Sequence, residues 1–137
     1  SAGVKGKNSW TTGVSMADVN GDGLLDIYVC YSGKGNLESR KNELYINQGD
    51  LTFKEDAKTF GLDDASNSTQ AMFFDFDKDG DLDMFLLNHN ITVINEIEFD
   101  QARSMRHPSA GDKLYRNDGG KFTDISEKAG IKGNAMG

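Results

Sequence analysis

The chain has 137 residues, of which 36% are hydrophobic and 27% are charged, with one Pro and one Cys. This length suits one small domain, and the apolar residues are spread too evenly for a disordered chain. No apolar run approaches the roughly 20 residues of a membrane helix, and no charged and apolar leader opens the sequence. We therefore expect neither a membrane span nor a signal peptide within these residues.

The net charge of −7 is concentrated in two short segments. Residues 18–26 contain three Asp and no base, and residues 75–83 contain five Asp and one Lys, so the two segments account for the whole net charge. Two anionic segments on an otherwise neutral chain indicate a cation as partner, and they argue against a nucleic acid, which requires a basic surface. The single Cys30 excludes a disulfide within the chain, and its apolar neighbours predict a buried, unreactive thiol.

The sequence contains two copies of one pattern. Asp18 recurs 57 residues later as Asp75, whereas Leu44 recurs 70 residues later as Leu114. The larger offset places an insertion in the second copy, at about residues 88–112. "AGIKG" near the end of the chain repeats the "AGVKG" near its start. The predicted units are a first repeat over residues 3–60, a second over residues 61–129, and the start of a third over residues 130–137.

Each copy predicts four short strands that are separated by turn residues. Apolar and β-branched residues alternate in these segments, and Gly, Asn and Asp lie between them. Short strands with tight connections form an antiparallel meander, so the expected fold is all-β with two four-stranded antiparallel sheets. The predicted strands are residues 12–18, 24–31, 43–47 and 51–55 in the first copy, and residues 69–75, 82–88, 113–117 and 121–124 in the second.

A single helical turn is predicted after the fourth strand of each copy. "DAKTFG" and "ISEKAG" end in Gly61 and Gly130, and a glycine in the left-handed conformation commonly closes a helix. Within the insertion, apolar residues at loosely helical spacing between Ile94 and Met105 predict one further short helix.

The two acidic segments have the spacing of an oxygen cage for a hard cation. Both follow D-x-[DN]-x-D-G-x-x-D, in which the Gly permits a sharp turn and the other marked side chains, with one backbone carbonyl, can surround an ion. A cage of about six to eight oxygens suits Ca²⁺, whereas Mg²⁺ uses fewer protein ligands and Zn²⁺ prefers His or Cys. The predicted ligands are Asp18, Asn20, Asp22, Asp26 and the Leu24 carbonyl for one Ca²⁺, and Asp75, Asp77, Asp79, Asp83 and the Asp81 carbonyl for a second.

Two other interpretations of the acidic segments are weaker. An EF-hand would have Glu at the twelfth position and helical flanks, and neither is present in the sequence pattern. Asp, Asn and Gly also form ordinary turns that bind no ion. The second copy in matching register favours cation binding over a plain turn.

The segments "ADVNGDGLLDIYV" and "FDFDKDGDLDMFLLN" resemble the FG-GAP or VCBS repeats that form the blades of integrin-α-like β-propellers. The continuation "DKLYRNDGGKFTDISEKAGI" is similar to a secreted bacterial branch that often also carries ASPIC/UnbV domains. The resemblance implies that each copy is a four-stranded blade whose acidic loop joins its first and second strands and binds one calcium ion. Such propellers usually have about seven blades, and this chain contains two copies.

The resemblance implies a calcium-binding, non-catalytic part of an extracellular or secreted protein that serves adhesion or the recognition of a protein or carbohydrate ligand. The alternative is the propeller portion of a carbohydrate-active enzyme, similar to a polysaccharide lyase, or of a lectin. Against catalysis, the sequence has no nucleophile elbow, phosphate-binding loop or Cys–His pair. His89 is predicted to form a hydrogen bond at a strand end.

Two expectations concern surfaces. In a meander, the insertion must emerge at the opposite end of its sheet from the acidic loop, and long loops commonly carry recognition. A pair of blades also leaves apolar faces and sheet edges uncovered, so we expect the fragment to self-associate.

Overall fold

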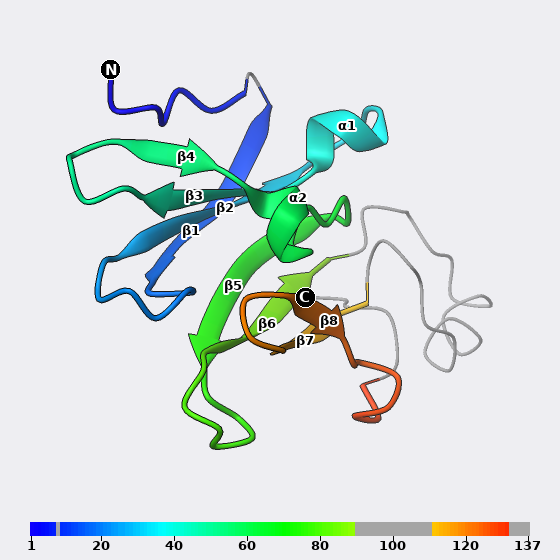
Figure 1. Cartoon of the computed structure of the whole chain (residues 1–137). Helices are drawn as coiled ribbons and strands as arrows, with labels where there is room; N and C mark the ends of the chain where they lie inside the picture. The colour runs from blue at the N-terminus through cyan, green and yellow to red at the C-terminus, as the bar shows by residue number, and fades with distance from the viewer. Residues whose placement is uncertain (8, 90–110, 132–137) are drawn as a thin grey trace.

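Two four-stranded antiparallel sheets form the fold, one from each sequence copy (Figure 1). The computed structural model describes residues 1–7, 9–89 and 111–131. Strands that are adjacent in sequence are adjacent in each sheet, in the orders β1-β2-β3-β4 and β5-β6-β7-β8. The all-β prediction of two antiparallel meanders is therefore confirmed. The sheets have the form of two β-propeller blades and do not close into a barrel.

The predicted strands are all present, and their ends differ from the predicted ends by at most two residues. The predicted helix between Ile94 and Met105 lies outside the described residues. The strands are β1 (Trp10–Ala17), β2 (Asp26–Ser32), β3 (Glu43–Asn47) and β4 (Phe53–Glu55) in the first blade, and β5 (Ser68–Phe74), β6 (Asp83–Asn88), β7 (Lys113–Asn117) and β8 (Phe122–Asp124) in the second. Two one-turn helices, α1 (Leu37–Arg40) and α2 (Ala57–Phe60), complete the described elements.

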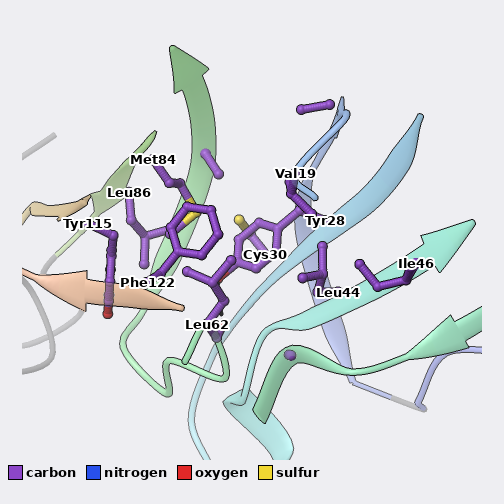
Figure 2. Close-up of a cluster of buried hydrophobic side chains, with 13 residues drawn as sticks. Val19, Tyr28, Cys30, Leu44, Ile46, Leu62, Met84, Leu86, Tyr115 and Phe122 are labelled. Carbon is purple, nitrogen blue, oxygen red and sulfur yellow. Dashed lines mark hydrogen bonds between the residues drawn. The ribbon is translucent and has the colours of Figure 1, made fainter. Parts of the chain in front are cut away.

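A shared hydrophobic core lies between the two blades (Figure 2). Apolar residues on alternate positions of each strand point to the same side, so each sheet presents one apolar face to the other. Tyr28 and Phe73 pack edge to face across the boundary, with ring centroids 5.9 Å apart. The link between the blades adds Leu62, which is fully buried. The other main contributors are Val19, Cys30, Leu44, Ile46, Met84, Leu86, Tyr115 and Phe122.

Polar contacts also join the first strands of the two blades, β1 and β5. The Thr12 hydroxyl donates to the Ser68 carbonyl at 2.6 Å, and the Gln70 amide donates to the Ser15 hydroxyl at 2.9 Å. Gly13 permits this close approach, because a Cβ at that position would lie 2.3 Å from the Thr69 carbonyl oxygen. The two blades thus pack through both apolar and polar groups.

The helical turn predicted after the fourth strand of the first copy is confirmed, and its left-handed closing glycine also occurs in the second copy. Gly61 closes α2 with φ of 76°, and its amide donates to the Lys58 carbonyl at 3.2 Å. Gly130 has φ of 77° and donates to the Glu127 carbonyl at 3.1 Å, although the preceding residues form a turn instead of a helix. Both glycines adopt the left-handed conformation, but the atoms that an added Cβ would meet differ between them.

We expect Gly61→Ala to destabilise the protein more than Gly130→Ala. Both substitutions place Ala in a left-handed conformation, which costs about 1–2 kcal/mol. Only at Gly61 would the new Cβ also meet a backbone carbonyl, that of Phe122 at 2.7 Å, and such overpacking adds about 1–3 kcal/mol. Urea unfolding of both variants measures the difference. Equal losses would show that the Phe122 contact does not matter.

Candidate metal centre

Both acidic loops join the first and second strands of a blade, as the sequence predicts. The first loop connects β1 to β2, and the second connects β5 to β6 (Figure 1). Each loop follows the strand that packs against the other blade and returns to a strand whose first residue, Asp26 or Asp83, is buried. Their bases are therefore anchored in the core, and their tips are exposed.

The first aspartate of each loop folds the backbone around its own carboxylate. Asp18 accepts hydrogen bonds from the amides of Gly21 and Gly23, each at 2.8 Å, through different carboxylate oxygens. Asp75 accepts in the same way from Asp79 at 3.2 Å and from Gly80 at 3.1 Å. Because these bonds involve the loop backbone, they hold each loop in a tight turn without a bound ion.

The last aspartate of each loop joins the loop to the neighbouring strand. Asp83 is fully buried, and its two oxygens accept from the amides of Phe76 at 3.0 Å and Asn117 at 2.8 Å. Asp26 makes the equivalent bonds to Val19 at 3.0 Å and Asn47 at 2.8 Å. These carboxylates support the fold, a role that the sequence analysis, which treated them only as ligands, did not assign.

Asn47 and Asn117 are supporting residues that the sequence analysis missed. The Asn47 side chain donates to the Leu25 carbonyl, and the Asn117 side chain donates to the Leu82 carbonyl, each at 3.1 Å. Both carbonyls belong to the residue that precedes the buried aspartate. The sequence did contain a signal for this role, because an asparagine follows a Leu-Tyr pair at the same spacing in both copies.

The second loop brings three carboxylates together. Asp75, Asp77 and Asp83 each offer an oxygen, and these oxygens all lie within 4.8 Å of one another. This set can hold a metal ion, and its ligands are carboxylates, which hard cations prefer. Asp79 instead accepts from the Asp81 amide at 2.9 Å, and the Asp81 side chain is exposed, as expected if its carbonyl is the ligand.

The first loop does not form an equivalent carboxylate set within the described residues. It has Asn20 where the second loop has Asp77, so one charged oxygen ligand is replaced by an amide. The Asn20 side chain donates to Asp22 at 2.9 Å, and Asp22 also accepts from the Leu24 amide at 2.8 Å. Asp18, Asn20, Asp22, Leu24 and Asp26 thus share one loop, in which the carboxylates of Asp18, Asp22 and Asp26 and the Asn20 side chain already form hydrogen bonds.

Carboxylate pKa values are shifted at both loops. The pKa of Asp77 is raised, first by loss of hydration and then by the charges of Asp79, Asp83 and Asp75. Burial raises the pKa of Asp26, although backbone hydrogen bonds from Asn47 and Val19 oppose the change. A bound cation would offset the repulsion between these carboxylates and so favour their ionised forms.

Cys30 and His89 are the other candidate reactive groups of the sequence. Burial raises the pKa of the Cys30 thiol to about 12, so the thiol stays protonated at neutral pH. His89 directly follows β6, and its Nδ1 lies 3.0 Å from the Thr69 hydroxyl, which confirms the predicted hydrogen bond at a strand end. No helix in the described part of the chain is long and apolar enough to cross a membrane.

A family model for the FG-GAP-like repeat matches residues 18–86, which begin at the first acidic loop and end within β6. The chain therefore belongs to the FG-GAP-like repeat family, and its fold is that of a β-propeller-like domain. No curated protein matches the chain.

Proposed function

We propose that the chain is a calcium-binding propeller module in which the ions stabilise the loops and perform no chemistry. The observation that carries this proposal is the convergence of Asp75, Asp77 and Asp83 within 4.8 Å. Calcium fits this donor set because it accepts several carboxylate and carbonyl oxygens in flexible geometry. We expect Asp79 and the Asp81 carbonyl of the second loop to supply further oxygen ligands, as the motif predicts.

The first loop is proposed as a second, weaker calcium site. Its Asp18 and Asp26 make the same backbone hydrogen bonds as Asp75 and Asp83, so the two loops share one scaffold. Asn20 supplies a neutral oxygen in place of the carboxylate of Asp77. Because ligand charge tunes calcium affinity, the first loop should bind the ion less tightly.

Calcium should raise the free energy of unfolding by about 2.7 kcal/mol per site when its concentration is a hundred times the Kd. Thermal melting in EDTA and in millimolar calcium measures this gain, and titration calorimetry counts the sites. Asp79→Ala and Asp22→Ala should each reduce the stoichiometry from two ions to one, with magnesium as the control cation. Coincident melting midpoints in EDTA and calcium would contradict the proposal.

The proposed setting is extracellular, since millimolar calcium there would fill sites of modest affinity. We propose a non-catalytic role in adhesion or ligand recognition, supported by the raised pKa of the buried Cys30 thiol and the hydrogen bond between His89 and Thr69. The alternative is the propeller portion of a carbohydrate-active enzyme or a lectin. Release of oligosaccharides from a polysaccharide would favour the enzyme, and glycan or protein binding without turnover would favour the recognition module.

A further inference from the structure

The first blade exposes an apolar face on the side away from the second blade. We call it face 1, formed by Val4, Val14, Met16, Ile27 and Val29. Val4, Val14 and Met16 are 43%, 53% and 59% exposed, and Ile27 and Val29 are half-buried. Apolar side chains gathered on one side of a sheet indicate a surface that binds another apolar surface.

The second blade exposes an apolar face on the side away from the first blade. We call it face 2, formed by Met72, Phe74, Phe85 and Leu87. Met72, Phe74 and Leu87 are 58%, 41% and 40% exposed, and Phe85 is half-buried. Faces 1 and 2 thus lie on opposite sides of the pair of blades.

The residues of face 1 have buried equivalents in the second blade. Val14 and Val29 are paired across β1 and β2, and the residues 57 positions later, Ala71 and Leu86, are paired across β5 and β6. Ala71 is 2% exposed and Leu86 is fully buried, because both pack against the first blade. Phe73 and Met84, 57 positions after Met16 and Ile27, also belong to or pack against the shared core. So does Leu62, which lies 58 positions after Val4 and follows Gly61 as Val4 follows Gly3.

The same relation holds for face 2. Met72 pairs with Phe85, and the residues 57 positions earlier, Ser15 and Tyr28, form the corresponding pair in the first blade. Ser15 donates to the Ala71 carbonyl, and Tyr28 is 1% exposed in the core. The equivalents of Phe74 and Leu87 are Ala17 and Cys30, which are both buried there. In the shared core, the first blade contributes the side that is equivalent to face 2. The second blade contributes the side that is equivalent to face 1.

We propose that face 2 of one copy of this chain binds face 1 of a second copy, repeating between copies the packing that joins the two blades within each copy. The interface is heterologous, since two different faces meet. Assembly therefore continues head to tail, either as a closed ring or as an open stack. The interface is distinct from pairing of exposed strand edges, which would involve the backbone of β4 or β8 instead.

Two charge-introducing variants test this arrangement. Val14→Glu places a charge on face 1, and Met72→Glu places a charge on face 2, both at positions that are more than half exposed, so the fold of each blade should persist. Leu37→Glu on α1, which is 59% exposed and belongs to neither face, is the matched control. Circular dichroism and thermal melting verify that each variant is folded.

Sedimentation velocity over a wide concentration range gives the readout. The unchanged chain and Leu37→Glu should form species larger than 15.0 kDa as concentration rises, whereas each of the other two variants alone should stay at that mass. An equimolar mixture of Val14→Glu and Met72→Glu should form a dimer and nothing larger, because one intact face 1 then meets one intact face 2.

Three results would overturn the proposal. The unchanged chain could remain monomeric at every concentration. Either single variant could still associate, which would indicate a symmetric contact through one face or an edge contact. The mixture of folded variants could fail to form dimers, in which case the two faces would not bind each other.

Discussion

Asp83→Ala is expected to destabilise the fold by about 3–6 kcal/mol even when no calcium is present. The fully buried carboxylate accepts from the amides of Phe76 and Asn117, and each hydrogen bond to a charged group contributes about 1.5–3 kcal/mol. Removing the carboxylate leaves the buried Asn117 amide and the partly buried Phe76 amide without this acceptor. The loss should therefore appear in EDTA as well as in calcium.

Asp77→Ala is the matched comparison within the same loop. Asp77 is exposed, and its pKa is raised by loss of hydration and then by nearby carboxylates, so removing its charge should not lower stability in EDTA. In calcium the variant should lose the stabilisation that the ion gives the second loop. Chemical unfolding of both variants with and without calcium separates the two roles. A loss for Asp77→Ala in EDTA, or none for Asp83→Ala, would contradict this division.

The sequence predicted the strands well because the pattern occurs twice. Residues that occupy the same position in both copies, such as Asp18 and Asp75, define the register of the strands around them. Strand β4 is shorter than predicted because the turn before it extends to Thr52, whose carbonyl accepts from the Gln48 amide at 2.9 Å. Leu51 adopts φ of 68° within that turn, which sequence patterning does not predict for leucine.

Helix α1 was not predicted because four residues are too few to show helical periodicity. The Asn36 side chain accepts from the Ser39 amide at 2.9 Å and begins the helix as its N-cap. In the first copy this turn lies between the second and third strands, where the second copy has the insertion, and residues 90–110 of that insertion lie outside the described part of the chain. Comparing the two copies could therefore not reveal it.

The sequence identified the ligand candidates and could not show how differently they are engaged. The spacing of the motif does not distinguish between its marked positions, so each was predicted to donate an oxygen ligand to the ion in the same way. In the structure, Asp26 and Asp83 are already bound by backbone amides, whereas Asp77 faces solvent among other carboxylates. This difference depends on β3 and β7, which are distant in sequence from the loops that they support. It follows that substitutions within one motif should have unlike effects on folding and on ion binding.

The link between the blades contains an ion pair that no motif indicated. Asp64 and Lys113 form a salt bridge in which the side chains are only 7% and 14% exposed. The Tyr115 hydroxyl donates to the same Asp64 carboxylate at 2.6 Å, and the Ser66 amide donates to its other oxygen at 2.8 Å. Asp64 thus connects the end of the first blade to β7 of the second.

Asp64→Asn is expected to destabilise the protein by about 3–5 kcal/mol at neutral pH. The amide keeps the shape and an acceptor, but Lys113 is left as a buried charge without its partner, which is the costly outcome for such pairs. Asp118→Asn is the control, because it removes the partner of the exposed Arg116 and should change stability little. A double variant, Asp64→Asn with Lys113→Met, should recover much of the loss. Urea unfolding at pH 7 measures all three.

The effect of Asp64→Asn should also depend on pH. Burial alone would raise the pKa of Asp64, but the charge of Lys113 and hydrogen bonds from Lys113, Ser66 and Tyr115 outweigh it and hold the pKa below its usual value of 3.8. A carboxyl whose pKa is lower in the folded state stabilises the fold above its unfolded pKa, and this contribution is lost as pH falls through the folded pKa. The difference in unfolding free energy between the unchanged protein and Asp64→Asn should therefore be constant from neutral pH to about pH 5 and then shrink below about pH 4. A difference that stays the same at low pH would show that the ionised carboxylate is not what stabilises this link.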